Sequence, residues 1–203
     1  MFKMLGKLVL SLSLAMSATA WADAEAAREK VIQVVDAFRT DIVADRDVLA
    51  KDPELLYARV EKILVHAVDF DQFSRKVMGK YYRRATPAQL ERFSQETKAT
   101  LLKTYGSSLL DLDPDKINVL PLGPQREGQP VKVDVTFQLE SAGLLNISFF
   151  MDENKAGDWL LDNIVINNIN FGLTFRKQFA VMMQQNKNNI DAAIDAWRDS
   201  LSK

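Results

Sequence analysis

The stretch "VKVDVTFQLESAGLLNISFFMDE", residues 131–153, alternates apolar and polar side chains on both sides of Ser141-Ala142-Gly143. Its apolar positions are Val131, Val133, Val135, Phe137 and Leu139, followed by Leu145, Ile147, Phe149 and Met151. Alternation with a period of two is typical of a strand that buries one face, and a short link that contains glycine predicts a hairpin. We therefore expect an antiparallel hairpin with one strongly apolar face at the centre of the fold.

One further strand is expected on each side of this hairpin. "INVLPLG", residues 117–123, predicts a first strand at a sheet edge, because Pro121 has no N–H group to donate to a ladder. "WLLDNIVINNI", residues 159–169, follows the turn "NKAGD" and predicts a fourth strand. Short connections make these neighbours antiparallel, so residues 116–169 predict a four-stranded, mainly antiparallel sheet.

Helical patterns occupy the segments before and after the sheet. Apolar side chains at helical spacing predict four helices within residues 23–112. They lie in "EKVIQVVDAFRTDIV", after Asp52-Pro53, over residues 69–80, and after Thr86-Pro87-Ala88-Gln89. The last of these is a capping-box signal, and the helix it starts ends before the acidic "DLDPD" at 111–115. Residues 171–202 predict two more helices, through Phe171, Phe175 and Phe179 and then Ile190, Ile194, Trp197 and Leu201. The order of helices, antiparallel sheet and helices along the chain predicts an α+β domain with about six to seven helices on the apolar face of the sheet.

The first 22 residues predict a secretory signal peptide. They contain two lysines and no acid, then the apolar run "LVLSLSLAM", then small residues that favour cleavage after Ala22. Cleavage leaves one domain over residues 23–203, with 24 basic against 27 acidic side chains. This balance argues against nucleic-acid binding. The absence of cysteine in an exported chain favours a bacterial periplasmic protein that needs no disulfides.

The residue types that most catalytic or metal sites require are scarce. His66 is the only histidine and there is no cysteine, which removes His-Cys metal sites and Cys-His nucleophilic pairs. No phosphate-binding loop, dinucleotide fingerprint, calcium loop or hydrolase elbow occurs. The sequence therefore favours binding over catalysis and predicts neither a cofactor nor a metal.

Large apolar residues at strand or helix period converge on one interior. The candidate lining residues are Phe73, Val77, Met78, Leu101, Tyr105, Leu109, Val133, Val135, Phe137, Leu139, Ile147, Phe149, Met151, Ile164, Ile166, Phe175 and Phe179. Periodicity alone does not separate a packed core from a lined cavity, so both interpretations stay open for each residue.

A family resemblance favours the cavity. "VDFDQFSRKVMGKYYRRATPAQLERF" and "LLKTYGSSLL" resemble segments of the MlaC family, the toluene-tolerance-type periplasmic phospholipid carriers. The resembling residues are Asp69, Phe70, Asp71, Ser74, Arg75, Val77, Gly79, Tyr82, Arg83, Ala85, Thr86, Pro87, Phe93, Thr104 and Tyr105, with Trp159, Asp162, Phe175, Arg176 and Phe179 near the C-terminus. Asn168 departs from the pattern by standing where the family would have a glycine.

The resemblance implies a hydrophobic cavity between sheet and helices that shelters the acyl chains of phospholipid as cargo. It implies a periplasmic shuttle that maintains outer-membrane lipid asymmetry. The implied partners are an outer-membrane lipoprotein–porin complex and an inner-membrane ABC transporter complex with its substrate-binding-domain protein. Arg83 and Tyr105 are the candidate head-group contacts by position.

Two other classes of function stay open at this point. A periplasmic chaperone or interaction module would offer a sheet edge or an apolar groove to peptide. A small-substrate enzyme would need clustered carboxylates at one end of a cavity, and nothing in their spacing singles out such a pair.

Overall fold

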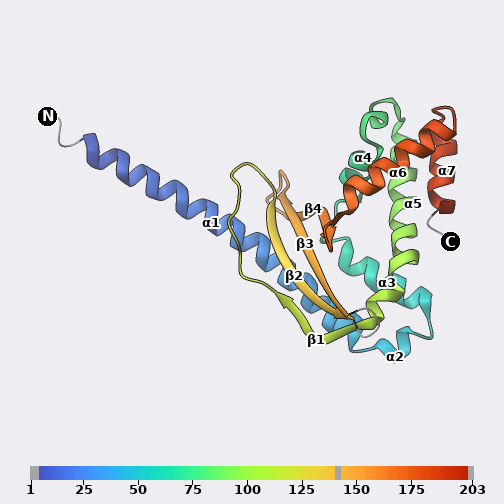
Figure 1. The fold of residues 1–203 in the computed structure, drawn as a ribbon, viewed down its shortest axis with the longest axis horizontal. Coiled ribbons are helices and arrows are strands. Elements are labelled where there is room, and N and C mark those ends of the chain that lie inside the picture. Colours follow the sequence, from blue (N-terminus) through green and yellow to red (C-terminus); the bar gives the residue numbers. More distant parts are fainter. Residues whose placement is uncertain (1–4, 140–142, 201–203) are drawn as a thin grey trace.

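The computed structural model describes residues 5–139 and 143–200, with the backbone alone for residues 5–21 and 114. It has one antiparallel sheet of five strands in the order β1-β2-β3-β4-β5, and seven α-helices (Figure 1). The strands are β1 (Leu112–Val119), β2 (Val131–Leu139), β3 (Gly143–Glu153), β4 (Trp159–Ile166) and β5 (Ile169–Asn170). The α+β fold and the central hairpin are confirmed, whereas the expectation of four strands is wrong by one.

The fifth strand arises from a two-residue turn inside the segment that we expected to be one strand. Asn167 and Asn168 have φ angles of 46° and 66°, which is the left-handed backbone that tight hairpins need and that asparagine tolerates better than most residues. Ile169 then pairs with Ile166. Asn168 therefore occupies a position where a glycine would also fit.

The first strand starts earlier than expected. Leu112 pairs with Leu139, and the ladder resumes with Ile117 opposite Phe137 after an irregularity. The buried side chains of Leu112 and Ile117 hold both ends of this interruption against the sheet, so the acidic segment between them lies within the strand. β1 is at an edge of the sheet, as the proline predicted.

Helix α1 (Leu5–Phe38) covers part of the apolar face of the sheet. Ala27, Val31 and Val35 form one stripe of this helix and are buried against Val133 and Val135 of β2. The helix continues as a π-helical turn, η1 (Arg39–Val43). It runs through the predicted cleavage site after Ala22, so the signal peptide stays a prediction. Among the residues described, no helix has the length and apolar character of a membrane span.

The middle helices are α2 (Arg46–Leu49), α3 (Pro53–Leu64), α4 (Phe70–Met78) with the 3-10 segment η2 (Gly79–Arg84), and α5 (Pro87–Tyr105) with η3 (Ser107–Asp111). Of these, α3 and α5 begin at the predicted capping signals and α4 begins where the apolar spacing predicted, whereas α2 was not expected. Asp52 and Asp69 accept N–H groups of the first turns of α3 and α4. Thr86 and Gln89 form the reciprocal capping box of α5. These caps satisfy N–H groups that a helix start otherwise leaves unpaired.

The last two helices pack on α4 and α5 and form a second apolar core. They are α6 (Phe171–Gln185) and α7 (Ile190–Ser200). Phe93, Phe179 and Trp197 have no exposed surface and lie in mutual ring contact. Leu201, which we expected to belong to the last helix, lies outside the described residues.

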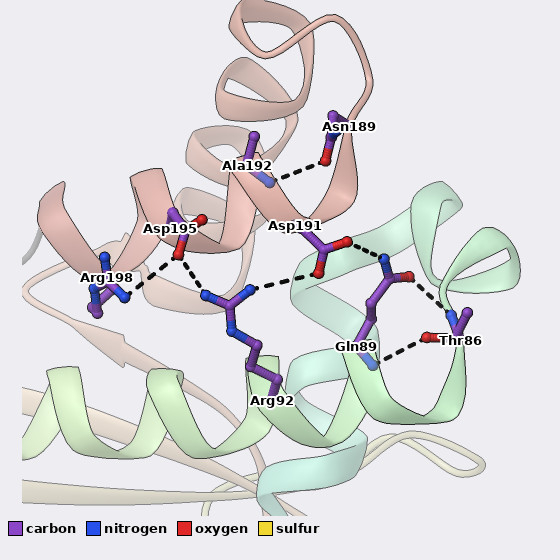
Figure 2. Close-up of polar contacts among 8 residues, drawn as sticks. All are labelled: Thr86, Gln89, Arg92, Asn189, Asp191, Ala192, Asp195 and Arg198. Atoms are coloured by element: carbon purple, nitrogen blue, oxygen red, sulfur yellow. Dashed lines mark hydrogen bonds and ion pairs between the residues drawn. The ribbon is translucent and has the colours of Figure 1, made fainter.

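A polar contact network holds α7 against α5 outside this core. Arg92 of α5 forms ion pairs with Asp191, at 3.5 Å, and with Asp195. Gln89, a member of the capping box, also donates to Asp191 at 2.8 Å (Figure 2). The start of α5 and the outer face of α7 are thereby joined.

Candidate functional site: an apolar lining beside a basic pocket

Seven of the predicted lining residues are fully packed and form core. Val133, Val135 and Met151 are buried against α1, while Val77, Met78, Phe175 and Phe179 are buried in the helical core. Their exposed fractions range from 0 to 4%. In the structure as it stands these side chains are surrounded by protein.

The side chains of the other ten predicted lining residues are not fully buried. Nine of them are apolar and the tenth is a tyrosine. They are Phe73, Leu101, Tyr105, Leu109, Phe137, Leu139, Ile147, Phe149, Ile164 and Ile166. We call this set the apolar lining. Tyr105 is the most exposed of the ten, at 42%. Because these ten side chains are not fully buried, an apolar ligand could contact them.

Strand register brings four members of the apolar lining together on one face. Val135, Ile147 and Ile166 are aligned across β2, β3 and β4, and Val133, Phe149 and Ile164 form the adjacent row. The β2 end of each row is buried beneath α1, while the β3 and β4 ends are partly exposed. Helix α1 thus leaves the β3–β4 side of the apolar face incompletely covered.

Helical members of the apolar lining border the same interior. Leu109 of η3 packs against both the α1–sheet core and the core formed by α3 and α5. In Figure 1 the sheet lies on one side and α3, α5 and α6 on the other, and the two sides meet where η3 leads into β1. Close to Leu109 in the chain, at the C-terminal end of α5, Tyr105 contacts Phe171 of α6 edge-on, with ring centroids 6.2 Å apart.

A basic pocket of about 830 Å³ lies between α4, η2, β4 and the first turn of α6. Its charged lining consists of Arg75, Lys76, Lys80, Arg83 and Arg176, with Asp162 as the single acid. Asn163, Asn170, Tyr82, Phe73 and Leu173 complete much of its wall. The pocket has a large excess of positive charge in a chain whose net charge is close to zero.

The position of Arg176 depends on a glycine. Gly79 joins α4 to η2 with φ at 57°, a backbone that side chains disfavour. A Cβ atom at this position would lie 2.7 Å from Nε of Arg176, closer than van der Waals contact allows. The absence of a side chain at Gly79 therefore permits the guanidinium to lie across the backbone at this turn.

The two predicted head-group residues are not brought together. Arg83 lines the basic pocket, whereas Tyr105 is not among its lining residues and contacts Phe171 instead. Sequence reasoning missed Phe171, Lys80 and the roles of Arg75, Lys76 and Arg176. The recurrence of Lys76, Lys80 and Arg83 within eight residues of sequence was a signal for part of the pocket, but only the tertiary fold adds Arg176.

Metal-binding groups and a positioned histidine are not found in the described part of the chain. Within residues 5–139 and 143–200, no three His, Cys, Asp or Glu side chains gather in a metal-binding group. His66 is exposed in the turn after α3. Neither observation supplies a catalytic group to the apolar lining or to the basic pocket.

Comparison with known proteins gives a consistent result. The family model described as MlaC protein matches residues 32–199. The chain is 33% identical to toluene tolerance protein ttg2D of Pseudomonas putida over 164 residues, covering 80% of this chain and 75% of that protein. It is 22% identical over 174 residues to the intermembrane phospholipid transport system binding protein MlaC of Haemophilus influenzae, covering 84% of this chain and 80% of that protein.

A solved structure shares the fold. The phospholipid-binding protein from Ralstonia solanacearum, determined in complex with a phospholipid, superposes with a TM-score of 0.75 at 20% sequence identity. The match covers 87% of this chain and 99% of that one. The family match extends over most of the chain and includes the sheet, the basic pocket and both C-terminal helices, so the chain belongs to the MlaC family.

Proposed function

We propose that this protein is a periplasmic phospholipid carrier whose apolar lining shelters acyl chains. The observation that carries the proposal is the partly exposed state of ten apolar or aromatic side chains in a chain of the MlaC family. A simple core would bury the β3–β4 side of its sheet as completely as the β2 side. The phospholipid transport protein of Haemophilus influenzae and the phospholipid-binding protein of Ralstonia solanacearum support the same class of cargo.

The energetics of acyl chains constrain how such a carrier works. Each buried methylene is worth about 0.8 kcal/mol relative to water, so two chains with about 30 methylenes would cost on the order of 20 kcal/mol to expose. Spontaneous release into water is therefore negligible. A membrane buries the same methylenes, so transfer between membrane and carrier can be nearly balanced when the two are in contact.

Transfer consequently requires docking to a membrane or to a membrane complex. We propose that the partners are an outer-membrane lipoprotein–porin complex on one side and an inner-membrane ABC transporter complex, with its substrate-binding-domain protein, on the other. Lipid exchange between these partners would serve outer-membrane lipid asymmetry. This assignment is supported by the membership of the chain in the MlaC family, whose resemblance implied these partners.

Lipid analysis of the natively purified protein tests the proposal. We expect chloroform extraction to yield phospholipid, native mass spectra to show a bound lipid, and delipidated protein to reload from phospholipid vesicles. Protein that is folded, lipid-free after gentle purification and unable to take up lipid from vesicles would contradict the proposal. Binding of apolar peptides by such lipid-free protein would favour a chaperone instead.

A matched pair of substitutions in β4 locates the acyl chains. Ile166 lies on the apolar face in register with Ile147, whereas Val165 points to the opposite face in register with Ser148. An amide buried among acyl chains without a hydrogen-bond partner is costly, so Ile166→Asn should strongly reduce lipid occupancy. Val165→Asn should leave occupancy close to that of the wild type. Equal occupancy in both variants would show that the acyl chains do not lie on this face.

A further inference from the structure

The basic pocket contains more positive charge than its own residues neutralise. Lys76 is paired with Asp162. Arg75 also borders a second, smaller pocket lined by Asp69, Asp71, Asp152 and Glu153, so it faces carboxylates as well as the basic pocket. The remaining cations of the basic pocket are Lys80, Arg83 and Arg176.

These three cations have no acidic partner in the part of the chain that the structure describes. Among the described residues, no ion pair or hydrogen bond is found for Lys80, Arg83 or Arg176, although Lys80 lies 5.1 Å from the ring centroid of Tyr81. They come from two separate segments, η2 and α6, and line the same concavity. Convergent arginines with free N–H groups are the usual protein recognition element for phosphate, because the guanidinium matches two phosphate oxygens.

The positive charge comes from side chains and not from the start of α6. The N–H group of Gly172 is taken by Asn163 Oδ1 at 3.1 Å, and that of Leu173 by Asn170 Oδ1 at 2.9 Å. The polar side chains at this helix start are thus engaged with the backbone. A bound anion would depend on the arginines and the lysine.

The pocket adjoins the apolar lining through the first turns of α6. Phe73 belongs to both, and its ring contacts Phe175, with centroids 6.3 Å apart. Phe175 contacts Phe171 at 5.5 Å, and Phe171 contacts Tyr105 at 6.2 Å. The basic pocket and the apolar lining therefore meet at Phe73, and ring contacts along the first turns of α6 link this point to Tyr105. A lipid whose phosphate lies in the pocket would bring its first methylenes against Phe73.

We propose that Lys80, Arg83 and Arg176 bind the phosphate group of the lipid whose acyl chains occupy the apolar lining. Gly79 acts as a positioning residue, because it leaves room for the guanidinium of Arg176. The proposal rests on the proposed function and adds to it a recognition element for cargo: a phosphorylated lipid would be favoured over a neutral lipid with the same acyl chains.

A competition between two lipids tests this selectivity. Delipidated protein is incubated with vesicles that contain phosphatidylglycerol and diacylglycerol with identical acyl chains, and the ratio of the two bound lipids is measured by mass spectrometry after extraction. We expect Arg83→Gln combined with Arg176→Gln to lower this ratio about fivefold, as the loss of two solvent-accessible charge contacts predicts. Arg84→Gln is the matched control, because Arg84 is exposed in the same segment and does not line the pocket.

Each outcome of the competition is decisive. A lower ratio in the double variant with an unchanged ratio in the Arg84 control supports the phosphate site, and Lys80→Gln should shift the ratio in the same direction with a smaller effect. An unchanged ratio in a double variant that still binds lipid overturns the phosphate site and leaves the proposed function intact. Failure of the wild-type protein to bind either lipid overturns both.

A second arm separates lipid phosphate from free phosphate. Inorganic phosphate is added to delipidated protein, and the melting temperature is recorded for the wild type and the double variant. If phosphate stabilises the wild type alone while the lipid ratio is the same in both proteins, the pocket takes a soluble anion, and the head-group proposal is overturned. If the lipid ratio differs between them, the head-group assignment stands.

Discussion

Replacing Phe179 with alanine should destabilise the protein strongly without removing its lipid. Phe179 has no exposed surface, and its ring contacts Tyr81, Phe93 and Trp197, with centroids at 6.3, 4.7 and 6.3 Å. A buried Phe→Ala substitution costs about 3 to 5 kcal/mol through lost burial and the cavity it leaves. In a domain of this size each kcal/mol lowers the melting temperature by about 2 to 4 °C. A decrease of about 10 °C is therefore expected for Phe179→Ala.

Ile147→Ala is the matched comparison in the apolar lining. Ile147 is central in its row of the sheet, between Val135 and Ile166, but its side chain is only partly buried. Its truncation should cost about 1 kcal/mol, or about 3 °C. Because its exposed surface would contact acyl chain, lipid uptake should fall in this variant and persist in Phe179→Ala below its melting temperature.

The assay measures two quantities on the same samples. Thermal unfolding is followed on delipidated protein, because a ligand bound to the native state alone raises the melting temperature by mass action. The molar ratio of lipid to protein is then measured after reloading from vesicles at a temperature where both variants are folded. Equal destabilisation by the two substitutions, or loss of lipid by folded Phe179→Ala, would refute the separation of core from lining.

Three further perturbations test particular contacts. Arg92→Ala should lower stability by about 1 kcal/mol, because it removes two solvent-accessible ion pairs to α7; chemical denaturation measures this effect, which should shrink at high salt. Gly79→Ala should lower the free energy of unfolding more than Gly128→Ala. Both glycines have φ above +55°, but only at Gly79 would a Cβ atom lie against a guanidinium. Equal losses would contradict the steric argument. Lys116→Met should raise the pKa of Asp113, which the hydrogen bond from Lys116 holds below its ordinary value. The stabilisation linked to this lowered pKa is present above the pKa of the unfolded chain and is lost as pH falls through that of the folded protein, and carboxyl NMR titration measures the shift.

The sequence by itself determined the local structure. Alternation in residues 131–153 predicted the β2–β3 hairpin, the signals at Asp52-Pro53 and Thr86 predicted two helix starts, and apolar spacing after Asp69 predicted a third. These features depend on side chains within a few residues of each other, which is why a pattern reveals them. The fifth strand escaped prediction because Asn167-Asn168 was read as strand, although asparagine also adopts the left-handed conformation that turns the chain.

Only the tertiary structure decided which apolar side chains are core and which remain accessible. Val135 and Ile147 have the same strand periodicity and are direct neighbours in the sheet, yet α1 buries the first and leaves the second partly exposed. The tertiary structure also decided the basic pocket. Arg83 and Arg176 are far apart in sequence, and they line one pocket because α6 packs beside α4, with Arg176 next to Gly79. Burial and charge convergence depend on contacts between distant segments, and periodicity along one segment carries no information about them.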